Sequence, residues 1–156
     1  MKKTMYFLLV VLFGLFLAGC GTSNADEGNQ ETENTNGSGN SIVAGKVVPT
    51  LTESSPLVYD YQVANQTEEE VVLEFTSSQR YDYAVSDSKG EQIYLYSSVA
   101  SFMQVMGEEK MKQGEALQYS IDLHELNLSP GSYVLSAWMT PQGGEEYKVE
   151  HDFTIE

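Results

Sequence analysis

The chain has 156 residues and carries 23 acidic but only 8 basic side chains, which gives a formal net charge of −15. Two of the basic residues lie in a leader that we expect to be removed, so the mature chain would keep 6 basic side chains and a balance of −17. Such a chain offers no basic face to phosphate groups, which excludes nucleic acid as a partner, and anionic lipid headgroups would repel it.

The first nineteen residues combine positive charge, an apolar run and small side chains. Lys2 and Lys3 precede apolar residues 5–17, a run shorter than the roughly 20 residues of a membrane-spanning helix. The sequence Leu-Ala-Gly before Cys20 resembles the lipobox of bacterial lipoproteins, in which cleavage leaves a diacylated cysteine. Cys20 is the only cysteine and so has no disulfide partner. We therefore predict that residues 1–19 are a lipoprotein signal peptide and that lipidated Cys20 anchors the protein at the extracytoplasmic face of the cell membrane.

The next stretch predicts a spacer. After Cys20, residues 21–41 contain no aromatic residue and no β-branched apolar residue. Their charged side chains are all acidic. Such a segment cannot bury enough apolar surface to offset the entropy lost on ordering. We expect residues 20–41 to form a disordered acidic tether, with a root-mean-square span of roughly 25 Å.

Residues 42–156 are long enough for one domain, and their pattern predicts an all-β fold. Apolar and polar residues alternate in short segments, and none shows helical spacing over three turns. The segments cover residues 42–48, 57–63, 71–75, 81–85, 92–96, 117–121, 133–139 and 147–155. Seven or eight short strands separated by turns are typical of a β-sandwich or barrel.

Tyr133 favours the sandwich. It follows Pro130 and Gly131 at the start of a predicted strand, as in the tyrosine corner of immunoglobulin-like folds. In such a corner the tyrosine hydroxyl bonds to the backbone a few residues upstream. Trp138 lies on the opposite face of the same strand, and we expect it to be partly buried packing rather than a binding anchor.

Residues 75–104 carry the clearest strand pattern. Tyr81 and Tyr83 share one face of a strand and Asp82 lies on the other. The turn that follows begins at Asp87, whose side chain can bond the backbone ahead of it, and ends at Gly90, which can take positive φ. The pattern predicts a β-hairpin.

Around this hairpin, particular residue types recur at a defined spacing. The residues concerned are Phe75, Gln79, Tyr81, Asp82, Tyr83, Gly90, Ser97, Phe102 and Gln104. With them, residues 57–139 resemble the BsuPI-type intracellular proteinase inhibitor family of Gram-positive bacteria. The resemblance implies an immunoglobulin-like antiparallel β-sandwich and inhibition of a serine proteinase. It brings no reactive-site pattern, and the export signal departs from the intracellular setting in the family's name.

The sequence contains no evident catalytic or metal-binding constellation. His124 and His151 are accompanied by no Gly-x-Ser-x-Gly elbow, phosphate loop or dinucleotide fingerprint. The thioethers of Met103, Met106 and Met111 suit only Cu(I), and packing beneath a loop is the simpler interpretation. There is also no Asp-x-Asp-x-Asp-Gly calcium loop. We expect no enzymatic activity, no metal and no cofactor.

The longest predicted connection, residues 97–114, is the best candidate for recognition because long loops on a rigid sandwich commonly carry function. Its candidate partner-binding side chains are Phe102, Met103, Val105 and Met106. In the alternative interpretation, Phe102 and Val105 close the end of the sandwich and the remainder is a solvated turn.

Three functions stay open on the sequence. The first is a monomeric, lipid-anchored inhibitor whose protein partner is a serine proteinase at the cell surface. The alternative is a non-inhibitory immunoglobulin-like interaction module of the cell envelope. The third and weakest is a lipoprotein that binds a soluble ligand or a metal.

Overall fold

The computed structural model describes residues 44–156. The predicted signal peptide (1–19), lipidated Cys20 and most of the stretch before the first strand, including the tether (20–41), lie outside the described residues. Within the described part of the chain, no helix is long and apolar enough to span a membrane.

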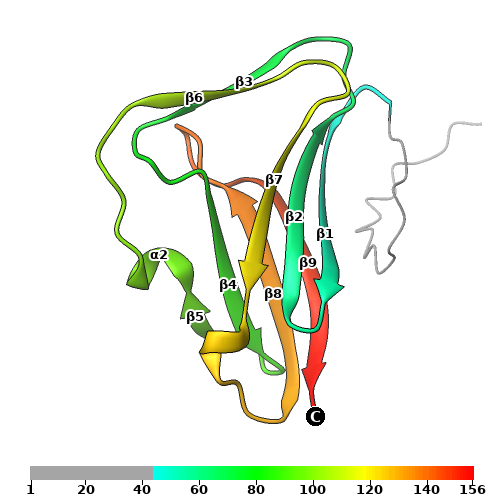
Figure 1. Ribbon diagram of the computed structural model, residues 1–156, viewed down its shortest axis with the longest axis vertical. Helices are drawn as coiled ribbons and strands as arrows, with labels where there is room; N and C mark the ends of the chain where they lie inside the picture. The colour runs from blue at the N-terminus through cyan, green and yellow to red at the C-terminus, as the bar shows by residue number, and fades with distance from the viewer. Residues whose placement is uncertain (1–43) are drawn as a thin grey trace, which may run out of the picture. The chain divides into compact units, whose positions relative to one another are not determined.

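The described residues confirm the predicted all-β, antiparallel sandwich (Figure 1). The strands are β1 (Val47–Ser55), β2 (Val58–Asn65), β3 (Val71–Phe75), β4 (Tyr81–Asp87), β5 (Gln92–Leu95), β6 (Gly107–Met111), β7 (Ala116–Asp122), β8 (Gly131–Met139) and β9 (Glu146–Ile155). Two short helical turns, α2 (Tyr96–Val99) and the 3₁₀ turn η1 (His124–Leu126), lie between them.

Two sheets face each other. One has the strand order β1-β2-β7 and the other β5-β4-β8-β9, while β3 and β6 form a separate two-stranded ribbon at one end (Figure 1). Alternate residues of β2 point inward, so that Tyr59, Tyr61 and Val63 are fully buried. They pack in one core with side chains of the opposite sheet such as Val85 and Leu135.

Two local predictions are confirmed. The β4–β5 hairpin forms, and Asp87 Oδ1 accepts hydrogen bonds from the backbone N–H groups of Lys89 and Glu91, both at 2.9 Å. Gly90 takes the positive φ of 81° that its turn position requires. The tyrosine corner forms as well, because the Tyr133 hydroxyl donates to the Ser129 carbonyl at 2.7 Å.

The sequence placed the first strand too early. The strand runs over Val47–Ser55 rather than residues 42–48, and its register pairs Val47 with Asn65. The side chain of Asn65 is fully buried and joins the turn after β2 to the end of β6. Its amide donates to the carbonyls of Glu69 and Met111, and its Oδ1 accepts the N–H of Thr67.

The predicted loop 97–114 was wrong in extent, because it contains strand β6, which the sequence pattern did not predict. β6 pairs with β3, and only Met111 among its inward residues is both apolar and fully buried. Glu108 and Lys110 alternate outward and form an ion pair at 2.9 Å. The sequence of β6 is rich in charged residues and shows no apolar alternation, so the strand was not predicted; it forms by pairing with β3.

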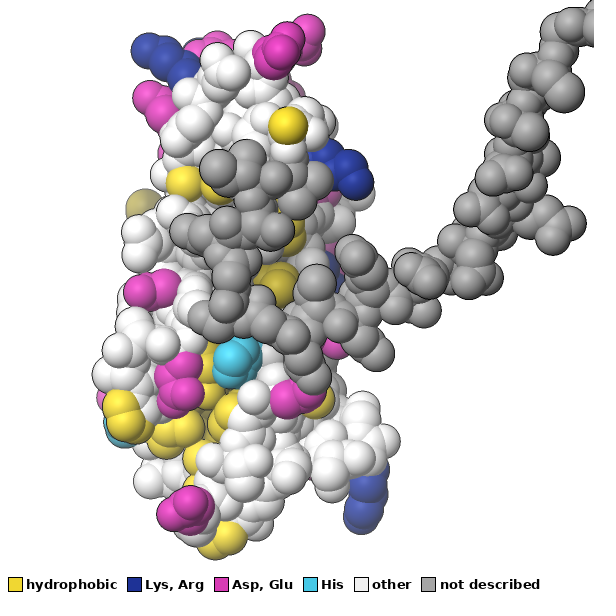
Figure 2. Space-filling model, turned by 90° about the vertical axis from the view of Figure 1, so that its right-hand side faces the viewer, with side chains coloured by type: hydrophobic (Ala, Val, Ile, Leu, Met, Phe, Trp, Pro, Cys, Tyr) yellow, Lys and Arg dark blue, Asp and Glu magenta, His cyan; other side chains and the backbone are white. Residues whose placement is uncertain are grey.

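The charged surface agrees with the composition. On the face seen in Figure 2, acidic side chains are spread among uncharged groups, and the few Lys and Arg side chains lie toward its edges.

Candidate partner-binding segment

Residues 100–106, here called the contact segment, are what remains of the predicted loop. They run along the side of the domain from α2 to β6 (Figure 1). The side chains of Met103 and Met106 are 72% and 70% exposed, and Val105 is also exposed. An apolar surface of this kind is costly to leave in water and commonly marks an interaction site.

The middle of the contact segment is tied to the connection between β3 and β4. The N–H of Ser78 donates to the Met103 carbonyl at 2.8 Å, and the N–H of Met103 donates to Ser78 Oγ at 2.9 Å. The N–H of Val105 in turn donates to the Met103 carbonyl at 3.0 Å. The backbone is therefore held in place at Met103, the residue of the segment that is most exposed.

Arg80 holds the far end of the segment. Its guanidinium lies 4.6 Å from the centroid of the Phe75 ring, donates to the Ser77 carbonyl at 2.8 Å and pairs with Glu109 at 2.9 Å. A Cβ placed on Gly107 would lie 2.5 Å from Arg80 Nη2. A side chain at position 107 would therefore displace the guanidinium from its present position.

The near end is held by a carboxylate and by aromatic packing. Asp82 Oδ1 accepts the N–H of Ser97 at 3.0 Å. Tyr96 stacks on Tyr83 with ring centroids 5.0 Å apart, and the ring of Phe102 meets Tyr96 edge-on at 5.8 Å. These ring arrangements are favourable for aromatic pairs.

Tyr81 and Tyr83 stack on Tyr96 beneath the contact segment and are here called the aromatic bed. Both are uncharged near neutral pH. Burial raises the pKa of Tyr83 far above its ordinary value, with a further contribution from its hydrogen bond to Tyr94. Burial also raises the pKa of Tyr81, and the neighbouring Tyr96 adds to the effect. The segment therefore rests on neutral, apolar packing.

The structure brings three of the four candidate side chains together at the surface: Met103, Val105 and Met106 are exposed. Phe102 is half-buried and supports the segment instead. In the alternative interpretation both Phe102 and Val105 close the sandwich; Val105 is exposed and does not, while Phe102 contacts Tyr96.

Sequence reasoning missed the groups that hold the segment. Ser78 and Arg80 lie 25 and 29 positions from their partners Met103 and Glu109, so no local pattern shows these contacts. It also passed over Val99 and Ile93, two exposed apolar side chains on α2 and on edge strand β5. Alternation alone could have flagged Ile93.

The remaining sequence candidates lie elsewhere. His124 Nδ1 is 2.7 Å from Asp122 Oδ1 at the end of β7, and His151 packs edge-on against Tyr59. Met111 is fully buried and therefore separate from the exposed Met103 and Met106. Within residues 44–156, no three His, Cys, Asp or Glu side chains gather to hold a metal ion.

Most family-pattern residues now have a structural role: Phe75 under Arg80, Asp82 on Ser97, and the tyrosines beneath Phe102. No curated protein matches the chain. The family model BsuPI, described as intracellular proteinase inhibitor, matches residues 47–144, from the start of β1 to the turn before β9. Because this match covers more than half of the sequence, the chain belongs to the BsuPI family of intracellular proteinase inhibitors.

Proposed function

We propose that this protein is a lipid-anchored inhibitor of a serine proteinase at the extracytoplasmic face of the cell membrane, and that the contact segment meets the proteinase. Membership of the BsuPI family supports inhibition. The single observation that carries the choice of surface is the pair of exposed methionines on a hydrogen-bonded backbone.

A fixed segment is suited to inhibition. Binding orders loops and side chains at an entropic cost, which is smaller when the backbone is already held in its bound form. Hydrogen bonds at Ser97 and Met103, and the Arg80–Glu109 ion pair just beyond its end, hold the contact segment at both ends and in its middle. The apolar side chains are then free to enter a partner's pockets.

The same attachments limit how the segment can bind. A substrate-like strand needs free backbone groups to pair with the enzyme, but both the N–H and the carbonyl of Met103 are bonded to Ser78. Contact at this residue would therefore be made by the side chain. This observation also favours the second candidate function, a non-inhibitory interaction module of the cell envelope that docks through the same methionines.

One experiment separates the two functions. The full chain, purified in detergent, is titrated against a panel of serine proteinases that includes subtilisin-like enzymes, and the intact mass of the chain is followed in each mixture. Stoichiometric loss of proteinase activity with an uncleaved chain is expected. Full activity throughout the panel would contradict inhibition, and cleavage within residues 100–106 would identify a substrate instead.

The anchor is tested independently. Expression in a bacterial host that processes lipoproteins should yield a chain that begins at Cys20 and carries the mass of its acyl groups. A Cys20→Ser variant should lose this added mass and leave the detergent phase on phase separation. A wild-type chain of unmodified mass would contradict the proposed attachment and location.

A further inference from the structure

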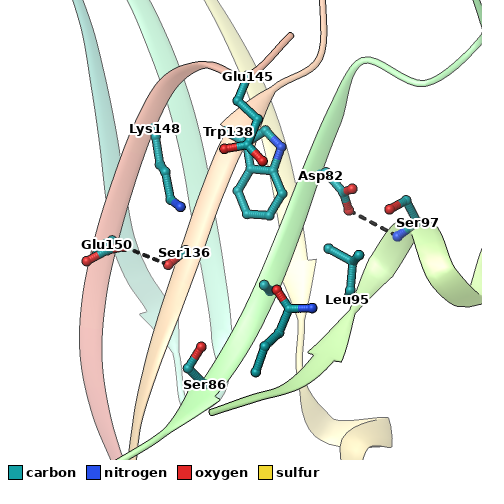
Figure 3. A pocket seen from close by; sticks show the side chains of 11 residues that line it. Asp82, Ser86, Leu95, Ser97, Ser136, Trp138, Glu145, Lys148 and Glu150 are labelled. Atoms are coloured by element: carbon teal, nitrogen blue, oxygen red, sulfur yellow. Dashed lines mark hydrogen bonds between the residues drawn. The ribbon is translucent and has the colours of Figure 1, made fainter. Parts of the chain in front are cut away.

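A polar hollow of about 440 Å³ lies on the outer face of the β5-β4-β8-β9 sheet, away from the core (Figure 3). Here it is called the outer hollow. The residues that matter for its chemistry are Asp82, Ser136, Trp138, Glu145, Lys148 and Glu150. Its size falls in the range of pockets that take small ligands or single side chains.

The floor of the outer hollow is unusually buried for the outside of a sheet. Outward-facing side chains of an antiparallel sheet are commonly solvated, but Asp82 and Trp138 are only 5% and 6% exposed. Both face away from the core, and in Figure 3 the indole lies between Asp82 on one side and Glu145 and Lys148 on the other. The carboxylate of Asp82 and the indole of Trp138 thus form the buried floor of the outer hollow.

Asp82 keeps one oxygen free. Its Oδ1 accepts the N–H groups of Tyr83 and Ser97 at 2.9 and 3.0 Å. Its Oδ2 accepts no hydrogen bond from residues 44–156. Because Oδ2 is still reached by solvent, it can accept a hydrogen bond from a positive or hydrogen-bonding group that enters the hollow.

Trp138 already has a cation over its ring. Lys148 Nζ lies 5.1 Å from the ring centroid, within the distance at which an ammonium is attracted to an indole face. Three carboxylates, those of Asp82, Glu145 and Glu150, line the hollow with this single lysine. The hollow therefore favours positive charge, and Lys148 shows that its aromatic wall accepts it.

A guanidinium fits this set of carboxylate acceptors better than other groups do. An ammonium would compete with Lys148 and gain nothing that the lysine does not already supply. A neutral sugar that displaced Lys148 from the indole face would leave the three carboxylates without a positive charge beside them. A guanidinium can stack on an aromatic ring and direct its five N–H donors to several carboxylates in one plane.

We propose that the outer hollow binds an arginine side chain of a protein partner, with the guanidinium stacked on Trp138 in place of Lys148 and hydrogen-bonded to Asp82 Oδ2. The acidic surface would favour approach of such a partner. The site lies on the opposite face of β4 from the aromatic bed, so this inference does not depend on proteinase inhibition.

Trp138 makes the proposal directly measurable, because it is the only tryptophan of the chain. The full chain in detergent is titrated with the blocked tripeptide acetyl-Gly-Arg-Gly-amide while tryptophan fluorescence is recorded. A saturable change is expected. The lysine analogue should bind several-fold more weakly, and methyl glucoside should give no change. No saturable change with the arginine peptide, or an equal response to lysine or glucoside, would overturn the proposal.

Three variants sharpen the test. Asp82→Asn keeps an oxygen for the Ser97 N–H but removes the charge, and should weaken arginine binding about tenfold or more. Lys148→Ala removes the competitor and should strengthen it, whereas a merely structural Lys148 would leave it unchanged or weaker. The control Glu70→Gln, which alters an exposed acid outside the hollow, should have no effect. Equal weakening by Glu70→Gln would indicate general charge attraction and contradict a defined site.

The source of the guanidinium is tested by comparing the blocked peptide with free L-arginine. A site for a partner's side chain should bind the peptide at least as tightly, because the free amino acid brings a carboxylate into an acidic hollow. Tighter binding of free L-arginine would overturn the assignment to a protein partner and indicate a small-molecule site.

Discussion

Two connections of the domain use their apolar residues in opposite ways. Between β7 and β8, Leu123 is 1% exposed, and Leu126 and Leu128 pack against the core. Between α2 and β6, Met103 and Met106 point into solvent. Both backbones are hydrogen-bonded, by Leu123 to Leu57 in one and by Met103 to Ser78 in the other. The exposed methionines add little to the core, and their ordered backbone is what the proposed contact with a partner would use.

The largest expected contrast is in stability. Leu123→Ala removes a fully buried side chain and should lower the free energy of unfolding by about 2–5 kcal/mol. Met103→Ala removes an exposed one and should change it by less than about 0.5 kcal/mol. Urea unfolding of the two variants measures both values. Comparable losses would show that the contact segment is part of the core after all.

Alkaline pH should weaken the domain through its buried tyrosines. Burial, with a smaller contribution from a nearby glutamate, raises the pKa of Tyr59 and of Tyr119 to about 12 from the ordinary value of 10.0. The folded protein therefore holds these protons more tightly than the unfolded chain. Stability from this source is complete below pH 10 and is lost as the pH rises from 10 toward 12.

Urea unfolding between pH 8 and 11, together with tyrosinate absorbance, tests this dependence. We expect a steady fall in the unfolding midpoint above pH 10, with late ionisation of part of the tyrosine population. A midpoint that does not fall above pH 10 would contradict burial of these hydroxyls. The Tyr119→Phe variant should show a shallower fall than the wild-type chain.

Arg80 should matter more for the contact segment than for the core. Arg80→Met keeps the aliphatic stem but removes the hydrogen bonds to Ser77 and Glu109. Because the Arg80 side chain is partly exposed, we expect the free energy of unfolding to fall by about 1.5 kcal/mol, the lower end of the range for hydrogen bonds to charged groups. Amide hydrogen exchange at Met103 should speed up more than exchange in β8. Uniform acceleration through the domain would assign Arg80 to global stability instead.

The smallest expected effects come from two tyrosine hydroxyls. Tyr133→Phe removes the bond to Ser129 and should cost about 1 kcal/mol. The Tyr59 hydroxyl is buried and has no hydrogen-bond partner within residues 44–156, so Tyr59→Phe should be neutral or slightly stabilising. Thermal unfolding of both variants distinguishes them. A larger loss for Tyr59→Phe than for Tyr133→Phe would reverse the ranking and show that the Tyr59 hydroxyl makes a stabilising interaction.

Much of the fold could be read from local pattern. Alternation placed Tyr81 and Tyr83 toward the core, Asp87 and Gly90 marked a turn, and Tyr133 marked the corner. These features depend on neighbouring residues and so leave a signal in the sequence. Strand β6 left no such signal in the sequence. It forms by pairing with β3, and Met111 is its only fully buried apolar residue.

The candidate site was only partly predictable. The apolar residues of the contact segment were visible as a group, but not which of them points inward: Phe102 does so because Tyr96 offers it a ring. The burial of Asp82 on the outer face escaped prediction, whereas Trp138 was expected to be partly buried and is 6% exposed. Alternation assigns these residues to the solvent side, and the walls that enclose them come from β5, α2 and β9.

The most direct test of the contact segment is a paired measurement on the variant Met103→Ser/Met106→Ser. Inhibition of the responsive proteinase and the free energy of unfolding are measured on the same preparation, with Val72→Ser as the control for an exposed apolar side chain elsewhere. We predict that the double variant loses inhibition while its stability stays within about 0.5 kcal/mol of the wild type, and that Val72→Ser keeps both. Undiminished inhibition, or unfolding of the double variant, would contradict the assignment of this surface.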